Sequence, residues 1–234
     1  MEKQALRERV WDELEERGEA RFPFPPHGRI PNFAGAKEAA DRLAAADEWA
    51  AADVIKSNPD SPQLPVRRRA LEAGKVVYMA VPRLSDEKCF LRLDPDAIDD
   101  IDHATTIGGS AELGEQVGPA EMAPVDLIVS GSVAVTEDGA RVGKGDGYSD
   151  LEFAVLREFG LVDDDTTTVT TVHEMQVVDQ EIPTTPQDVP MDRLFTPERS
   201  IRTDAPTTKP SGIDWDALSD ERAEEIPILA RLEP

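Results

Sequence analysis

The segment GARVGKGDGYSD, residues 139–150, holds the residues best suited to chemistry. Glycines let a backbone approach a ligand closely and point amide groups at it. The segment has four of them: Gly139, Gly143, Gly145 and Gly147. Arg141 and Lys144 add positive charge, and a helix expected from Asp150 would turn its positive end toward the same place. This pattern favours a phosphate-binding loop, with Asp150 placed to hold the Mg²⁺ of a nucleotide.

A purely structural interpretation of the same residues stays open. Ser149 and Glu152 have the spacing of a capping box, and Asp150 in a first helical turn complements the helix dipole. Lys144 is followed by glycine and not by serine or threonine, so the segment is not a Walker-type P-loop. Spacing alone leaves a phosphate cradle and a tight capped turn as alternatives.

Further candidates lie outside this loop. Lys3 and Arg7 are four residues apart in a helical pattern and share one face, from which they would clamp phosphates. Asp60 follows an Asn-Pro turn at the end of a predicted strand, where a side chain reaches into a cleft. Asp188 and Asp192 offer a second metal carboxylate. In a chain this acidic, a solvated surface position is the alternative for each Asp.

Alternating strands and helices must position these residues. Helical spacing covers residues 2–18, 35–51, 62–73 and 150–159, and the first of these helices has Leu6, Val10, Trp11 and Leu14 on one stripe. Strands are predicted at 52–58, 75–84, 125–135, 166–173 and 192–197. Residues 85–124 read as loops with one or two short helices. This order predicts a mainly parallel sheet covered by helices on both faces, in a domain spanning 1–206. Residues 207–234 are expected to be a linker and a short helix over 216–225, with Trp215, Leu218, Ile226 and Leu229 as docking residues. The glycine-rich loop follows the strand at 125–135, so it is expected at the carboxyl edge of the sheet.

The composition excludes several functional classes. Asp and Glu number 48 against 25 Lys and Arg, giving a net charge of -23 that repels nucleic acid and anionic membranes. No apolar run approaches the roughly 20 residues that cross a bilayer, and the N-terminus is charged throughout. The single cysteine, Cys89, is expected to be a buried structural thiol. We expect a soluble cytoplasmic protein, either from a salt-accumulating halophile or, alternatively, from an ordinary cell.

Several longer motifs resemble those of 5-formyltetrahydrofolate cyclo-ligases, also called methenyltetrahydrofolate synthetases. They include KxxLR near the N-terminus, AGK before a strand, and DLIV followed by GARVGKGDGYSD. The likeness is closer to the divergent branch of methenyltetrahydrofolate synthetase domain-containing proteins, through HGRIPNFAGAKEAA, IKSNPDSPQ, LEAGKVVYMAVPRL, GKGDGYSDLEFA, VHEMQVVD and IPILARL. It runs in order along nearly the whole chain, and with the acidic surface it suggests a haloarchaeal member.

The resemblance implies a three-layer α/β/α fold like that of ribose-5-phosphate isomerase and the CoA-transferases. It also implies a ligase that uses ATP and Mg²⁺ to close 5-formyltetrahydrofolate to 5,10-methenyltetrahydrofolate. In that reaction ATP phosphorylates the formyl oxygen, N10 attacks the activated carbon, and phosphate departs. Such chemistry depends on positioning and charge neutralisation more than on a protein nucleophile.

Matched residue by residue, the resemblance implies roles for individual side chains. Lys3, Arg7, Arg141 and the loop from Gly143 to Ser149 would contact ATP, with Lys144 and Tyr148 acting in catalysis and also facing the folate. Asp150 and Asp188 would hold Mg²⁺. Ile55 and Asp60 would contact the folate. The family's loop G-x-G-x-G-Y-Y-D-R is matched by Gly143, Lys144, Gly145, Asp146, Gly147, Tyr148, Ser149, Asp150 and Leu151.

The departures from this pattern define the alternatives. Ser149 and Leu151 replace a Tyr and an Arg, Asp146 puts an anion inside the cradle, and Asp60 is shorter than the family's Glu. A non-catalytic regulator that binds nucleotide or folate on the same scaffold is therefore the alternative to an enzyme. An RNA-associated protein ranks last, because the chain lacks an aromatic RNA-binding strand and carries the wrong charge.

Overall fold

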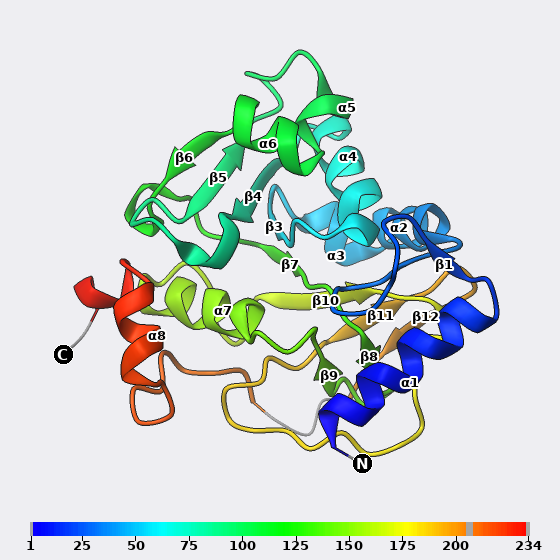
Figure 1. Ribbon diagram of the computed structural model, residues 1–234. Coiled ribbons are helices and arrows are strands. Elements are labelled where there is room, and N and C mark those ends of the chain that lie inside the picture. The colour runs from blue at the N-terminus through cyan, green and yellow to red at the C-terminus, as the bar shows by residue number, and fades with distance from the viewer. Residues whose placement is uncertain (1, 205–207, 233–234) are drawn as a thin grey trace.

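The computed structural model describes residues 2–204 and 208–232, and its central feature is a mixed sheet (Figure 1). In the described residues this sheet has eight strands in the order β12-β11-β10-β7-β3-β4-β5-β6. The five strands from β11 to β4 are parallel, whereas at the edges β12 pairs antiparallel with β11, β5 with β4, and β6 with β5. The strands are β3 (Val54–Ser57), β4 (Val76–Ala80), β5 (Phe90–Leu93), β6 (Glu115–Val117), β7 (Leu127–Val129), β10 (Thr167–Thr171), β11 (Arg193–Phe195) and β12 (Ser200–Arg202).

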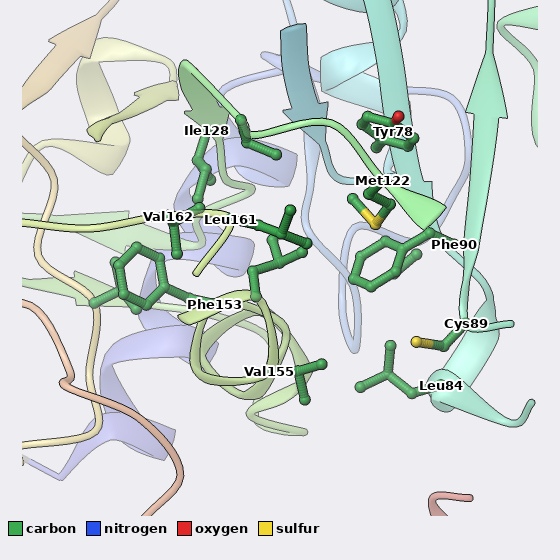
Figure 2. Packing of buried hydrophobic residues seen from close by; sticks show 14 of the residues in the cluster. Tyr78, Leu84, Cys89, Phe90, Met122, Ile128, Phe153, Val155, Leu161 and Val162 are labelled. Atoms are coloured by element: carbon green, nitrogen blue, oxygen red, sulfur yellow. The ribbon is translucent and has the colours of Figure 1, made fainter. Parts of the chain in front are cut away.

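Side chains alternate between the two faces of the sheet and so define two apolar layers. Leu127 and Val129 pack in one cluster with α2 (Ala36–Ala44), α3 (Asp47–Ala51) and α4 (Leu64–Glu72). Ile128, between them, packs in the other cluster with α7 (Tyr148–Glu158). Figure 2 shows this second cluster, with Phe153 and Val155 of α7 near side chains of β4, β5 and β7. The arrangement confirms the predicted three-layer α/β/α fold.

A third apolar cluster lies beyond the α/β/α layers, at the carboxyl ends of the parallel strands. Helix α1 (Lys3–Glu16) buries Leu6, Val10, Trp11 and Leu14, which are the four residues of its predicted stripe. They pack against a hairpin of β8 (Ala134–Val135) and β9 (Arg141–Val142), and Figure 1 shows α1 beside these strands. A second hairpin, β1 (Ala20–Arg21) with β2 (Asn32–Phe33), lies in the proline-rich connection. The helix therefore stands next to the strand that leads into the glycine-rich loop.

Three expectations about elements were wrong. Residues 125–135 form two strands in different sheets, β7 and β8, because the chain turns at Ser130 to Ser132. Residues 35–51 form two helices, since Ala46 has extended backbone angles. Residues 85–124 contain the edge strands β5 and β6 as well as α5 (Ile101–Ala104) and α6 (Ile107–Leu113). Short 3-10 helices occupy Ser61–Gln63, Pro82–Leu84, Pro119–Glu121, Glu174–Gln176 and Leu229–Arg231.

The C-terminal segment, residues 208–232, packs on the α7 side of the sheet. Its helix α8 (Asp220–Glu225) begins later than predicted and buries no residue of its own. Ile226 and Leu229 are fully buried, and Trp215 and Leu218 pack partly buried against the same cluster, as expected of docking residues. The expected boundary between 206 and 207 lies outside the described residues. Within the described residues, no helix is long and apolar enough to span a membrane.

Candidate functional site

A cavity of about 640 Å³ opens at the carboxyl ends of β3 and β7. β3 and β7 are parallel neighbours. The next strand after β3, which is β4, lies on one side of this pair, and the next sheet strand after β7, which is β10, lies on the other. Such switch points are where open α/β sheets bind ligands. The cavity is lined by Asn58 to Asp60 after β3, by Gly131 after β7, and by residues 141–150.

The glycine-rich loop connects β9 to α7 along one wall of this cavity. Gly145 and Gly147 have φ of 124° and 67°, which only glycine adopts without strain. Gly147 is the N-cap of α7, so the helix begins at Tyr148, two residues before the predicted start. Arg7 Nε donates to the carbonyl oxygen of Gly143 at 2.7 Å. The loop is thus shaped by its glycines and tied to α1.

The four predicted phosphate-binding cations line the cavity beside the loop. Lys3 and Arg7 reach the cavity from successive turns of α1, and Lys144 lies on the loop itself, 3.0 Å from Asp146. Arg141 is 7% exposed and donates to the carbonyl oxygen of Gly131 at 2.9 Å. Its Nε is buried and has no hydrogen-bond partner among the described residues. The structure therefore brings together all four predicted phosphate-binding cations.

The two predicted magnesium ligands both line the cavity and both have protein partners. Asp150 Oδ1 accepts from Arg141 at 2.6 Å and from the backbone N–H of Val189 at 3.0 Å. Asp188 Oδ2 accepts from Lys3 Nζ at 2.8 Å. No group of three or more His, Cys, Asp or Glu suited to a metal occurs in the described ranges. The two carboxylates join α1, α7 and residues 185–189 around the cavity, and their role as metal ligands stays a prediction.

Of the two predicted folate contacts, Asp60 and Ile55, only Asp60 lies at the cavity. Asp60 lines the cavity, and burial raises the pKa of its carboxyl although Lys144, Arg67 and Lys56 act in the opposite direction. Arg67 holds this turn from behind by donating to the carbonyl oxygens of Asn58 and Asp60 at 2.6 and 3.0 Å, and burial lowers its own pKa to about 10. Ile55 is fully buried among the side chains under α2 and α4 and does not line the cavity. Its side chain points to the face opposite α7, so the structure does not bring the predicted folate contact of Ile55 to the site.

A buried polar cluster of Lys56, Asn58, Ser149 and Glu152 was not predicted. The capping box that the spacing of Ser149 and Glu152 offered as an alternative is absent, because Gly147 is the N-cap of α7 and both residues lie inside the helix. Ser149 Oγ instead lies 3.4 Å from Asn58 Oδ1 and 3.3 Å from Ser130 Oγ, and Glu152 accepts a hydrogen bond from Lys56. Lys56, a charged residue within a strand predicted to be buried, was the signal in the sequence that could have revealed this cluster.

The predicted residues Asp192 and Cys89 lie away from the cavity, and so do the titratable residues His173 and Glu174. Asp192 accepts from the backbone N–H of Thr168 and from Lys209, which is a structural role at the opposite end of the strands. His173 caps a 3-10 helix, and Glu174 pairs with Arg199. Cys89 is buried, and desolvation raises the pKa of its thiol to about 12, as befits a structural cysteine. None of these four residues lines the cavity.

Comparison with known proteins supports the resemblance seen in the motifs. A model of the 5-formyltetrahydrofolate cyclo-ligase family matches residues 1–197. The chain belongs to this family. It is 41% identical over 98% of its length to a methenyltetrahydrofolate synthase domain-containing protein of Mus musculus, and 38% identical over 98% to the one of Homo sapiens.

The relatives also differ from this chain. It spans 63% of the mouse protein and 61% of the human one. The solved structure of Aquifex aeolicus 5,10-methenyltetrahydrofolate synthetase is similar, with a TM-score of 0.55 and 20% identity over 86% of this chain and 93% of that one. At that identity the likeness shows the fold alone. The family and its fold are therefore established, and the activity must be argued from the cavity.

Proposed function

We propose that this protein closes 5-formyltetrahydrofolate to 5,10-methenyltetrahydrofolate at the expense of ATP. The observation that carries the proposal is the convergence of separate chain segments on one cavity. Cations from α1 and β9, the glycine-rich loop, two carboxylates and Asp60 all line the same space of about 640 Å³. Membership of the cyclo-ligase family and the cyclo-ligase-like fold support the same assignment.

The residues that line the cavity fit a nucleoside triphosphate. Arg141 has a buried Nε without a partner in the described part of the chain, and the left-handed glycines leave the backbone of the loop open to a ligand. In a chain with a net charge of -23, four cations around one loop are an arrangement that anionic phosphates explain. Lys3, Arg7, Arg141 and Lys144 would hold the phosphates. Asp150 and Asp188 would hold Mg²⁺, which supplies charge neutralisation at the transferred phosphoryl group.

The opposite wall suits a folate. Met79, Leu91 and Ile107 give the cavity an apolar side, and Ile107 is 62% exposed, an unusual position for a large apolar side chain unless something covers it. Asp60 lies between this wall and the glycine-rich loop. A flat, partly apolar heterocycle with polar edges matches such a surface, and its formyl group would then face the phosphate-binding cations.

The proposed reaction proceeds by activation of the formyl oxygen. That oxygen takes the terminal phosphoryl group of ATP, and ADP leaves. The N10 lone pair then forms a bond to the formyl carbon, the carbon–oxygen bond breaks, inorganic phosphate carries the oxygen away, and N10 loses its proton. The protein's part is to align the two reacting groups and to neutralise developing negative charge, with Lys144 at the oxygen and Tyr148 against the ring.

One observation favours the alternative of a binding protein without catalysis. The carboxylate of Asp146 lies 3.0 Å from Lys144 Nζ. It therefore pairs with the cation that the proposed reaction requires. Both side chains are about half exposed, at 42% and 52%, so such a pair contributes little and yields readily to a more charged ligand. We therefore expect phosphate to displace Asp146 from Lys144.

The experiment that separates the two functions is a turnover assay. Purified protein is mixed with 5-formyltetrahydrofolate, ATP and Mg²⁺ at several salt concentrations, and the absorbance of methenyltetrahydrofolate is followed. The proposal predicts product formation that requires all three components. ATP binding without turnover at every salt concentration would favour the regulatory protein.

A further inference from the structure

The wall of the cavity contains an ion pair between two buried side chains. Lys56 on β3 donates to Glu152 on α7, and the two side chains are 1% and 6% exposed. Glu152 lines the cavity, whereas Lys56 does not. The lysine therefore lies behind the carboxylate, and Glu152 is the member of the pair that a ligand can reach.

Stability does not explain this pair. Removing two charges from water costs several kcal/mol per ion, and apolar residues of similar volume often serve a fold equally well or better. On the adjacent strands Lys56 pairs with Tyr78 and Ile128, which both belong to the apolar cluster under α7, so an apolar side chain would have apolar neighbours at this position. A costly charge pair that also faces a ligand cavity points to a role in binding.

The surroundings of the pair connect it to both sides of the site. Lys56 Nζ lies 3.5 Å from Asn58 Oδ1, and Ser149 Oγ lies 3.4 Å from the same oxygen. The charges of Lys56 and Glu152 both reach Asp60, although its carboxyl is influenced more by Lys144 of the glycine-rich loop. Asp60 and Glu152 both line the cavity, and Asn58 links the Lys56–Glu152 pair to Ser149 of the glycine-rich segment.

A carboxylate held by a lysine has a defined chemistry. Its two oxygens provide about four acceptor positions, of which Lys56 fills one, so Glu152 retains capacity for two parallel N–H donors. The pterin ring of a reduced folate carries such donors side by side, namely the 2-amino group and the adjacent ring N3–H. An adenine ring has no equivalent pair of adjacent donors.

We propose that Glu152 is a recognition residue for the pterin ring, accepting its 2-amino and N3–H donors, and that Lys56 is the positioning residue that holds this carboxylate at the cavity wall. The inference rests on the proposed function, because it assumes that the cavity takes a reduced folate. The Lys56–Glu152 pair, which joins β3 to α7, would then select the heterocycle.

The test uses a variant that removes both charges together. Lys56→Met with Glu152→Leu leaves no unpaired buried charge, so folding is expected to be retained. The matched control is Arg193→Met with Glu48→Leu, which removes a pair between β11 and α3 whose side chains are each 17% exposed and which lies outside the cavity. Equilibrium dissociation constants are measured for ATP, for 5-formyltetrahydrofolate and for its analogue without the 2-amino group.

The wild type and the control are expected to prefer the amino-bearing folate roughly 10- to 100-fold, the value of hydrogen bonds to a charged acceptor. The Lys56/Glu152 variant is expected to lose this preference while its affinity for ATP stays unchanged. A retained preference, or a parallel loss of ATP binding, would overturn the recognition role. If the wild type binds neither folate, the proposed function fails as well. If it turns over the folate while the variant keeps the preference, only this inference fails.

A single variant gives an independent reading in turnover. Glu152→Gln keeps the shape of the side chain and removes its charge, and it is expected to raise the KM for 5-formyltetrahydrofolate about tenfold with the KM for ATP unchanged. Equal increases in both KM values would indicate a general structural defect and would contradict the proposal.

Discussion

The guanidinium of Arg222 lies 4.6 Å from the centre of the Tyr148 ring, so that the C-terminal segment contacts the first residue of α7. Arg222 also donates to the carbonyl oxygen of Asp146. Residues 208–232 lie beyond the part of the chain that the family model matches, which ends at 197. A segment outside the shared family core therefore helps to hold the glycine-rich loop.

Arg222→Ala is expected to loosen this loop without unfolding the protein. A cation–π contact and one hydrogen bond together contribute on the order of 1–2 kcal/mol, so the KM for ATP should rise roughly 5- to 20-fold. Arg231→Ala is the matched control, because Arg231 pairs with Glu87 in the same segment at 3.4 Å and outside the cavity. An unchanged KM in Arg222→Ala would show that the contact does not position the loop.

Lys144→Ala and Asp150→Asn are expected each to lower kcat/KM about 100-fold or more, since each removes charge at the transferred phosphoryl group. Asp150→Asn preserves the shape of the partner of Arg141 and so limits the loss of stability. Lys88→Ala, which removes an exposed pair with Glu121, serves as the control. Near-normal rates in both site variants would mean that the reaction occurs elsewhere.

Asp60 gives a pH-dependent prediction for stability. Burial raises the pKa of its carboxyl in the folded protein above the ordinary value of 3.8, so folding favours the protonated form. Its contribution is fully present below pH 3.8 and is lost as the pH rises through the folded-state pKa. Asp60→Asn should therefore raise the melting temperature relative to the wild type at neutral pH, with a difference that shrinks as the pH falls.

Glu121 supplies a control of opposite sign. The backbone N–H of Gly118 lowers the pKa of its carboxyl, so its contribution is present at neutral pH and is lost as the pH falls. Glu121→Gln should therefore destabilise the protein at neutral pH and have little effect at acidic pH. Melting curves of both variants from pH 4 to 8 that moved in the same direction would contradict the assigned causes.

The net charge of -23 predicts a dependence of stability on salt. Like charges destabilise a compact state, and at about 1 M salt the screening length falls to about 3 Å. The melting temperature is expected to rise steadily as KCl is increased from 0.1 to 2 M. A melting temperature that stayed constant or fell over this range would show that self-repulsion does not limit the fold.

Local periodicity predicted the parts of the fold that depend on local pattern. The stripe of α1 and the buried strands β10 and β11 follow from spacing, and so does the position of the glycine-rich loop at the carboxyl edge of the sheet. Strand β6 was missed because Glu115 and Gln116 are exposed at the sheet edge and carry no apolar signal. The break between β7 and β8 was missed because both halves are buried and apolar.

Contacts between distant residues escaped prediction for a different reason. Lys56 and Glu152 are 96 residues apart, and Arg222 and Asp146 are 76 apart, so no local pattern relates them. Ser149 and Glu152 do not form the capping box that their spacing offered, because the left-handed Gly147 is the N-cap and the helix begins at Tyr148. Ser149 and Glu152 instead contact Asn58 and Lys56 in the polar cluster.

The most direct test of the proposed reaction follows the formyl oxygen. The protein is given ATP, Mg²⁺ and 5-formyltetrahydrofolate whose formyl oxygen is ¹⁸O, and the inorganic phosphate is analysed by mass spectrometry. Ring closure through a phosphorylated formyl group predicts one ¹⁸O in the phosphate for each methenyltetrahydrofolate formed. Phosphate without the label, or no methenyltetrahydrofolate at any salt concentration, would contradict the account.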